Sequence, residues 1–188
     1  MGTLIVWMSL SLDGFMEGPG REIDWHRVDD ELAAHFNDEL RDKGAFLDGR
    51  VTYELMADYW PTADADPMCP PAVAEFARIW RDKRKVVYSR TLREAGWNTT
   101  VVRDVVPEDV IALKAEIDGD LMLGGADLSN VFMRLGLVDE LQLYIHPVVI
   151  GAGKRLFQSA DAVANLELLE TRSFANGVVL LRYRVVQA

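Results

Sequence analysis

Short apolar runs alternate along most of the chain with segments whose apolar residues recur every three or four positions, and this alternation constrains the fold most. Runs that are apolar throughout are typical of strands buried on both faces of a parallel sheet, and the segments between them suit crossover helices. The runs expected to be strands are Leu4 to Leu10, Ala45 to Leu47, Lys85 to Tyr88, Thr100 to Arg103, Leu121 to Leu123 and Leu141 to Val149. The pattern therefore predicts an α/β fold with a mostly parallel central sheet flanked by helices.

Five helices are expected between these strands, from their start and stop signals. The first begins at Asp29 or Asp30, either of which can cap exposed helix amides, and the second begins at Arg50. The third follows the prolines after Cys69, the fourth begins at Pro107, and the fifth follows the glycine pair at 124–125. The side chains expected to face the core are Leu32, Phe36, Leu40, Leu55, Met56, Tyr59, Val73, Phe76, Ala77, Trp80, Val110, Leu113, Ile117, Leu128, Val131, Phe132 and Leu135.

The C-terminal part of the chain changes character. Two β-rich stretches, Leu166 to Phe174 and Val178 to Val186, flank Asn176-Gly177. Asn-Gly is strongly favoured in the tight turns that join antiparallel strands, so we expect a C-terminal antiparallel hairpin that makes the sheet mixed. The length of 188 residues suits a single domain over residues 1–188.

The charge balance restricts the partners. The chain carries 30 acidic and 20 basic side chains, a formal net charge of −10. Because nucleic-acid affinity depends on clustered Lys and Arg, we expect no nucleic-acid partner. No apolar stretch reaches the ~18 residues that a membrane helix needs, and the run from Leu4 to Leu12 lacks the basic flank and cleavage site of a signal peptide. We therefore expect no membrane partner and a cytoplasmic location.

The cysteine and histidine residues do not form a metal-binding pattern. Cys69 is single, so it supports neither an internal disulfide nor a thiolate zinc site. The three histidines, His26, His35 and His146, are far apart in the sequence. We expect no metal site, and we expect His35 on the outer face of the first helix.

Groups suited to binding phosphate follow three of the expected strands. Gly49-Arg50-Val51-Thr52 follows the second strand, Ser89-Arg90-Thr91 the third, and Gly124-Gly125 the fifth. Helix N-termini, hydroxyls and guanidinium groups bind anions, and open parallel sheets bind ligands at the carboxyl ends of their strands. Each segment alone also fits an ordinary turn or helix start, and none has the Rossmann or P-loop pattern. Together they indicate a site for a ligand that carries phosphate.

Several segments, in this order, resemble the dihydrofolate reductase-like superfamily. The main ones are Ser9-Leu10-Ser11-Leu12-Asp13-Gly14-Phe15, Gly49-Arg50-Val51-Thr52-Tyr53-Glu54 and Gly124-Gly125-Ala126-Asp127-Leu128. Supporting segments are Asp24-Trp25, Gly136 to Leu141, and Pro147 to Gly151 followed by Gly153 and Leu156-Phe157. The resemblance covers nearly the whole chain and is closest to the reductase C-terminal domain family of riboflavin biosynthesis.

The resemblance implies that NADPH lies across the carboxyl ends of the strands, with its nicotinamide near Ser9 and beside residues Asp13 to Met16. The positions that match the site of the 2′-phosphate and adenosine are Arg50, Ser89 and Arg90. Those that match the diphosphate cradle are Gly49, Thr52, Gly124, Gly125 and Ala126. The peptide between the two adjacent glycines is expected to be strained, with a cis bond as one form.

The resemblance also implies hydride transfer to a C=N or C=O bond of a small planar heterocycle. A riboflavin-pathway pyrimidine such as 5-amino-6-(5-phosphoribosylamino)uracil is the first choice. Asp13 and Asp24 are the candidates for orienting a proton, because a carboxyl group in a closed cleft can have a raised pKa. Trp25 is the candidate for stacking on the substrate. The family also implies a homodimer, and the apolar stretch Leu141 to Ile150 and the long C-terminal hairpin provide more β surface than one small domain easily covers.

Three features depart from the family patterns. The carboxylate that binds pteridine in dihydrofolate reductases has no counterpart, because the matching position is Ala33 and the nearest acids, Asp29, Asp30 and Glu31, come earlier. Asp48 replaces the apolar or small residue expected before the Gly-Arg pair. The zinc deaminase signature found in many riboflavin enzymes is not in the sequence. A dihydrofolate reductase with a displaced acid and a non-catalytic nucleotide-binding protein remain as alternatives.

Overall fold

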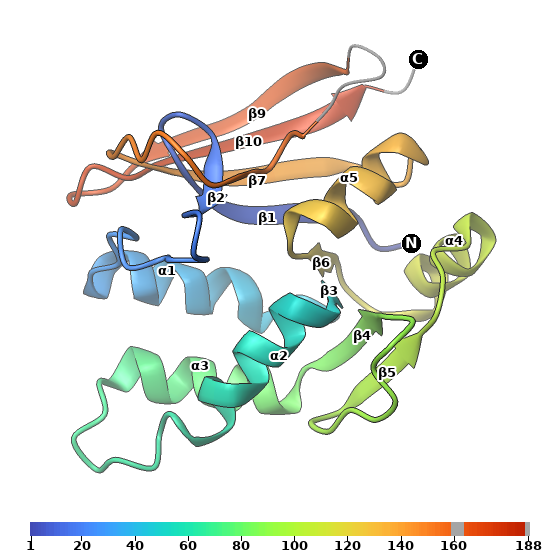
Figure 1. Cartoon of the computed structure of the whole chain (residues 1–188), viewed down its shortest axis with the longest axis horizontal. Coiled ribbons are helices and arrows are strands. Elements are labelled where there is room, and N and C mark those ends of the chain that lie inside the picture. The colour runs from blue at the N-terminus through green and yellow to red at the C-terminus, as the bar shows by residue number, and fades with distance from the viewer. Residues whose placement is uncertain (159–163, 187–188) are drawn as a thin grey trace.

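A computed structural model describes residues 1–158 and 164–186 of the chain. Its core is an eight-stranded sheet, seen in Figure 1. In spatial order the strands are β5 (Thr99–Val102), β4 (Arg84–Tyr88), β3 (Ala45–Gly49), β6 (Leu121–Leu123), β1 (Leu4–Ser11), β7 (Glu140–His146), β10 (Val179–Val186) and β9 (Asn165–Ser173). The first six are parallel, and β10 is antiparallel to both of its neighbours. The predicted mixed, mostly parallel sheet with a C-terminal hairpin is confirmed.

Helices cover both faces of the sheet. They are α1 (Asp30–Arg41), α2 (Arg50–Tyr59), α3 (Pro71–Asp82), α4 (Pro107–Glu116) and α5 (Ala126–Arg134), with a 3-10 turn at Trp60–Thr62 and a small second sheet of β2 (Phe15–Glu17) and β8 (Lys154–Arg155). One core cluster joins Val110 of α4 and Phe132 of α5 to the sheet. Leu40 of α1, Tyr53 of α2 and Trp80 of α3 pack in another. Therefore α4 and α5 cover one face, and α1, α2 and α3 cover the other.

Local chemistry explains where these elements begin and end. The Asp29 side chain caps α1 by accepting a hydrogen bond from the Leu32 amide at 3.0 Å, as its position predicted. Strand β7 ends at His146 and not at Val149, because Pro147 has no amide hydrogen to continue the ladder. The hairpin turns at Gly177, whose φ of +87° glycine adopts without strain.

Three of the side chains expected in the core are on the surface instead. Leu55, Tyr59 and Leu135 are 48%, 55% and 42% exposed. In α2 the buried side chain is Tyr53, which stacks on Trp80 of α3. The buried side of α2 is therefore displaced by about one residue from the predicted stripe. The reason is that α2 packs against Trp80 of α3 as well as against the sheet.

The prediction that His35 lies on the outer face of α1 is wrong. Its side chain is buried, and its Nε2 atom lies 3.0 Å from the hydroxyl of Tyr144 on β7. Gln142 also donates to this hydroxyl, at 2.7 Å, and the ring of Phe174 packs against His35. These contacts hold α1 against β7.

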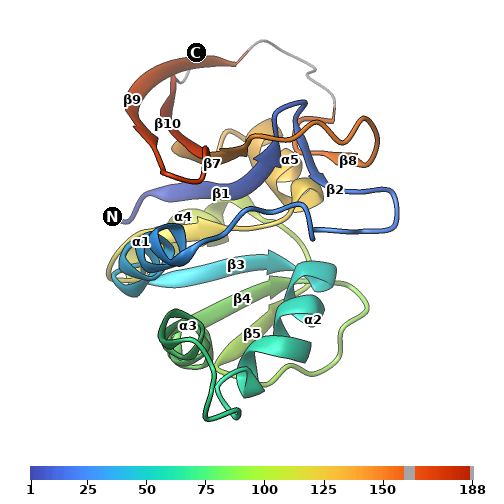
Figure 2. The ribbon, with the colours of Figure 1, turned by 90° about the vertical axis from the view of Figure 1, so that its left-hand side faces the viewer.

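The carboxyl ends of the parallel strands gather at one edge of the molecule. In Figure 2 the strands β1, β3 and β4 run in the same direction toward the region of α2, α5 and the small sheet. This edge is where a parallel sheet of this kind binds ligands.

Candidate active site

The fold brings together the glycines that follow β3 and β6. Leu47 pairs with Leu123 across the two strands, and the Gly124 amide donates to the Leu47 carbonyl at 2.9 Å. The next amide, of Gly125, donates to the sulfur of Met8 on β1 at 3.3 Å. Two segments that lie far apart in the sequence thus form one backbone surface at the carboxyl edge.

Side chains on β3 and α2 press closely against this backbone. A Cβ atom added to Gly124 would lie 2.6 Å from Oδ1 of Asp48, and one added to Gly125 would lie 2.8 Å from Oγ1 of Thr52. At Gly49, in contrast, an added Cβ would meet nothing within 4 Å and would point into open space. The first two glycines are required by the packing, whereas Gly49 leaves room that a ligand could occupy.

Two helices start at this edge with uncapped amides. α2 begins after Gly49 and α5 after Gly125, and neither has a side-chain cap among the hydrogen bonds of the described residues. The free amides and the helix dipoles therefore make both starts suitable for an anion. The cis bond, one of the forms expected for the strained Gly124–Gly125 peptide, is not found, because no peptide bond in the described part of the chain is cis; Gly125 has a φ of +85°.

The predicted arginines lie at the ends of the neighbouring strands β3 and β4, and both are exposed. Arg50 pairs with Glu54 at 2.6 Å, and the Nε atom of Arg90 donates to Asp104 at 2.8 Å. An anion that binds here must compete with these carboxylates, but exposed ion pairs of this kind are weak. Both guanidinium groups are thus available to a phosphate.

The other polar groups after β4 shape its loop. The Ser89 hydroxyl accepts from the amides of Thr91 at 3.2 Å and Leu92 at 2.9 Å. Arg103, which no sequence motif marks, donates to the carbonyls of Ser89 and Leu92 at 3.1 and 2.8 Å. A lone arginine after a short strand is not a specific sequence signal, so only the folded loop shows that Arg103 supports the segment after β4.

Ser9 and Met16 are the residues expected beside the nicotinamide, at the other end of the cofactor from its 2′-phosphate. Ser9 is nearly buried on β1, where it pairs with Tyr144 of β7, and Met16 of β2 packs on the core. Because strand side chains alternate, Ser9 and Ser11 share the sheet face of Trp7, which packs against Phe36 of α1.

The contacts of Asp13 do not fit the raised pKa expected of a proton donor. Its carboxylate accepts from the amides of Ile150 at 3.3 Å and Gly151 at 2.9 Å. The Ser11 hydroxyl, together with these amides, lowers the pKa of Asp13 below its ordinary value. Asp13 therefore remains ionised and ties the loop after β1 to the segment after β7.

The other candidates for the substrate side lie in the loop before α1. Asp24 is exposed, whereas Trp25 is half-buried and donates from Nε1 to the Glu22 carbonyl at 3.1 Å. The Trp25 ring meets His26 edge-on at 4.3 Å and His146 edge-on at 5.8 Å between ring centroids. Trp25 thus contributes to an aromatic cluster at the carboxyl end of β7.

Asp48 is a buried acid beside Gly124 of the cradle. It is buried on β3, and burial raises its pKa to about 7, although Lys85 lowers it in part. The Lys85 ammonium donates to the carbonyls of Trp80 and Lys83 and lies 4.3 Å above the Trp80 ring. Burial also lowers the pKa of Lys85 to about 8. The cradle therefore holds an acid that titrates near neutral pH.

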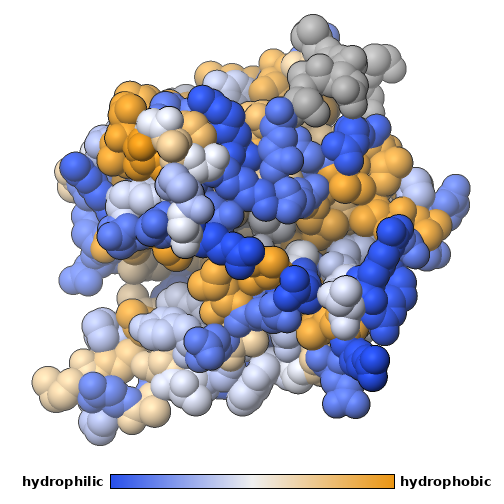
Figure 3. Space-filling view, viewed as in Figure 1, coloured by the Kyte–Doolittle hydropathy of each residue, from blue (hydrophilic) through white to orange (hydrophobic). Residues whose placement is uncertain are grey.

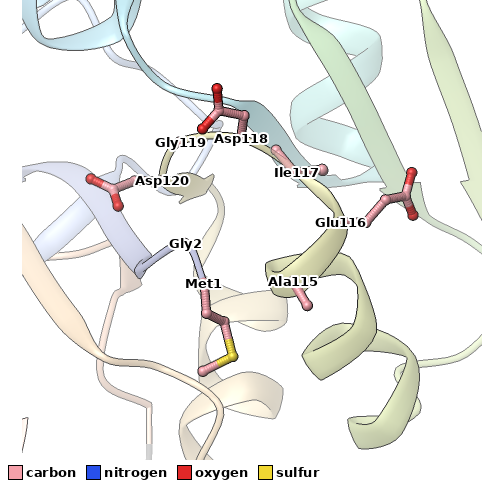
Figure 4. Close-up of a pocket in the computed structure, with 8 residues that line it drawn as sticks. All are labelled: Met1, Gly2, Ala115, Glu116, Ile117, Asp118, Gly119 and Asp120. Atoms are coloured by element: carbon pink, nitrogen blue, oxygen red, sulfur yellow. The ribbon is translucent and has the colours of Figure 1, made fainter.

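A surface hollow elsewhere on the molecule does not compete with this site. It is lined by Met1, Gly2 and residues 115–120 (Figure 4). Gly2 lies two residues before the start of β1, and Asp120 lies directly before the start of β6. The hollow is therefore at the amino-terminal edge of the sheet. It lies at the opposite end of the strands from the glycine cradle.

Comparison with known proteins identifies the family of the chain. The model of the RibD C-terminal domain matches residues 2–180. The chain belongs to the RibD C-terminal domain family. An uncharacterized protein of Bacillus subtilis strain 168, YyaP, is 37% identical over 181 residues, which cover 96% of this chain and 93% of YyaP.

Solved structures outside the close relatives show that this RibD C-terminal domain has the dihydrofolate reductase-like fold. Dihydrofolate reductase from Enterococcus faecalis, complexed with NADP(H), has a TM-score of 0.65 at 18% identity, covering 99% of this chain and 98% of that one. A deaminase/5-amino-6-(5-phosphoribosylamino)uracil reductase from Thermotoga maritima has a TM-score of 0.67 at 15% identity, covering 98% of this chain and 57% of that one.

Membership of the family supports a reductase, and so an oxidoreductase that acts on a small molecule. Within the described residues of this RibD C-terminal domain, no helix is long and apolar enough to cross a membrane. The same residues contain no cluster of three His, Cys, Asp or Glu side chains that could hold a metal ion.

Proposed function

We propose that this protein is an NADPH-dependent reductase of a small planar heterocycle, formed as one domain over residues 1–188. A pyrimidine like that of the riboflavin pathway is the first substrate choice. The observation that carries the proposal is the cradle formed by Gly49, Gly124 and Gly125, in which open space at one glycine lies beside two uncapped helix starts. A diphosphate fits this combination of free amides and room.

Residues around the cradle would hold the rest of the cofactor. We assign the 2′-phosphate and adenosine end to Arg50, Ser89 and Arg90, and the diphosphate to the three glycines with Thr52 and Ala126. The nicotinamide is assigned to Ser9 and Met16. When bound, NADPH supplies the hydride, and the protein supplies orientation and electrostatic stabilisation.

The substrate is assigned to the side of the sheet covered by α1. Trp25 would stack on a flat ring there. Asp24 is the carboxyl group proposed to orient a proton on this side, because its exposed side chain can face a substrate. The contacts of Asp13 instead suit a loop anchor beside the nicotinamide.

Dihydrofolate itself is a poorer choice of substrate. The side chain of Asp29 already accepts a hydrogen bond from the helix amide of Leu32, so it is not a free displaced acid. The position that matches the pteridine-binding acid is Ala33, which cannot form a charge-assisted hydrogen bond.

We also propose a homodimer formed through the C-terminal hairpin. The strand β9 is the edge of the sheet, and Leu166 and Leu168 on it are 41% and 54% exposed, with Val186 of β10 46% exposed. Figure 3 shows apolar residues on the surface in patches between hydrophilic ones. The predicted stretch Leu141 to Ile150 contributes less than expected, because Leu141, Leu143 and Tyr144 are already buried within the chain.

The test is a fluorescence titration with NADPH, followed by turnover with pyrimidine, other carbonyl and imine acceptors monitored by NADPH absorbance. We expect NADPH to bind and at least one flat acceptor to be reduced. Tight NADPH binding without reduction of any acceptor would favour the non-catalytic alternative, and no binding at any pH would reject the cofactor.

A further inference from the structure

At the carboxyl end of β7, His146 has one ring nitrogen engaged and the other without a partner. Its side chain is fully buried, and the Arg27 amide donates to Nδ1 at 2.9 Å. Nδ1 therefore carries the lone pair, and the proton of the neutral ring is on Nε2. The buried Nε2 has no hydrogen-bond partner among the described residues.

A second imidazole covers the first. The ring of His26 stacks on His146 with centroids 5.0 Å apart and an angle of 17°, and its Nε2 is also buried without a partner in the described chain. Buried polar groups without partners are rare in native proteins, and two in contact call for an explanation. Burial lowers the pKa of both rings to about 4, so both are neutral at pH 7.

The position of the His26–His146 pair at the carboxyl end of β7 places it near the proposed nicotinamide site. His146 pairs in register with Ser11, two residues after Ser9, where the nicotinamide is assigned. Because strand side chains alternate, His146 shares the α1-facing side of the sheet with Ser9 and Ser11. The loop that carries His26 and Trp25 covers His146 from this same side.

The contacts of this covering loop are mostly internal to it. The Gly18 amide donates to the Glu22 carbonyl at 2.9 Å, Trp25 donates to the same residue, and the His26 amide donates to the Ile23 carbonyl at 3.0 Å. A shift of the His26 ring would therefore expose the Nε2–H of His146 without breaking these bonds, because none of them is made by that ring. The hydrogen bond from Arg27 would keep the tautomer unchanged.

We propose that His146 binds the acceptor: once His26 moves aside, the Nε2–H donates a hydrogen bond, in the plane of the imidazole, to a carbonyl oxygen or ring nitrogen of a flat, uncharged heterocycle. This inference rests on the proposed reductase function and names the group that reads the substrate. A neutral N–H donor favours a ring with an exposed acceptor atom over a cation, which offers no lone pair to it, and the neighbouring aromatic rings suit a flat ligand.

Two variants separate ligand binding from a structural role. His146→Asn places an amide oxygen near the position of Nδ1, so it keeps the acceptor for Arg27 and removes the distant donor. His146→Gln places an amide nitrogen near Nε2, so it keeps the donor and loses the contact with Arg27. Each variant preserves what the other removes.

The probe is 5,6-diaminouracil, titrated into the protein saturated with NADP⁺, with binding followed by calorimetry and stability by thermal unfolding. We expect His146→Asn to bind the probe at least ~10-fold more weakly with a Tm within about 2 °C of the wild type. We expect His146→Gln to stay within about threefold of wild-type affinity but to unfold at a lower temperature.

A structural role alone predicts the reverse order, with normal binding by His146→Asn and impaired binding by His146→Gln, and this result would overturn the inference. Failure of the probe to bind the cofactor-loaded wild type would also overturn it. NADP⁺ binding is measured first, so its failure would reject the proposed function separately. A ¹⁵N spectrum of labelled histidine adds a direct readout: the Nε2–H tautomer is expected in the free protein, and its signal should shift with the probe.

Discussion

Oδ1 of Asp48 lies 2.6 Å from the point where a side chain on Gly124 would begin. A buried acid thus touches the backbone to which we assign the cofactor diphosphate. The pKa of about 7 means that its charge changes within the range in which such an enzyme works. This relationship yields a prediction for stability.

The variant Asp48→Asn should change how stability depends on pH. Because the folded-state pKa is raised above the ordinary value of 3.8 to about 7, the folded protein keeps a proton between these pH values that the unfolded chain has lost. The free energy of unfolding of the wild type should therefore fall from pH 5 to pH 8 by roughly 2.5 kcal/mol relative to Asp48→Asn. Urea unfolding at both pH values measures this.

The exposed Asp58 provides the control, since Asp58→Asn should leave the pH dependence of the wild type unchanged. Stability curves for Asp48→Asn and wild type that run parallel from pH 5 to pH 8 would show that Asp48 is ionised throughout this range.

The variant Gly49→Ala should lose NADPH affinity while keeping its stability. The φ of Gly49 is −77° and a Cβ atom added there meets nothing within 4 Å, so the folded protein accepts the methyl group of alanine. If the diphosphate occupies this space, the methyl group should weaken NADPH binding by roughly tenfold or more. The measurement is a fluorescence titration together with Tm.

Gly96 offers a matched control, because an added Cβ there also meets nothing within 4 Å. Gly96→Ala should bind NADPH like the wild type. Equal affinities for the two variants would place the diphosphate away from Gly49.

The variants Arg50→Ala and Arg90→Ala should reduce the preference for NADPH over NADH. Both guanidinium groups lie at the ends of adjacent strands, and a 2′-phosphate between them would gain charge-assisted hydrogen bonds. We expect each substitution to weaken NADPH binding by about tenfold and to leave NADH affinity nearly unchanged. Arg134→Ala, on the last turn of α5, is the control. Equal wild-type affinities for the two cofactors would contradict the assignment.

Dihydrofolate should be reduced poorly or not at all. Without a carboxylate at Ala33, the pteridine ring loses a charge-assisted pair of roughly 1.5 to 3 kcal/mol, about ten- to a hundredfold in affinity. The comparison is kcat/KM for dihydrofolate against pyrimidine and carbonyl acceptors. Efficient turnover of dihydrofolate that Asp30→Asn abolishes would show that the acid has moved along α1.

Leu168→Lys should convert a dimer into a monomer. Leu168 is 54% exposed on the edge strand β9, and a buried ammonium group at an interface is costly. Light scattering at micromolar concentration should give the mass of a dimer for the wild type and of a monomer for the variant. Leu55→Lys, at a similarly exposed position on α2, should remain dimeric. A monomeric wild type would remove the basis for the proposed dimer.

The sequence by itself determined the class of fold and predicted the segments to which we assign the cofactor. The apolar runs predicted the strands within a few residues, and Asn176-Gly177 predicted the hairpin, because strand burial and turn geometry are encoded in neighbouring residues. The segments at Gly49 and Gly124 were recognisable for the same reason: each is a strand end followed at once by a helix start.

Only the tertiary structure decided the environment of individual polar side chains. In the sequence Asp48 is only a local departure from a pattern, but its pKa depends on burial within the fold and on Lys85 of the neighbouring strand β4. His146 and Arg27 are hydrogen-bonded although 119 positions separate them. The same holds for His35, buried against Tyr144, and for Leu55, left exposed. Burial and hydrogen-bond partners are set by contacts between distant segments, and such contacts leave no periodic trace in the residues on either side.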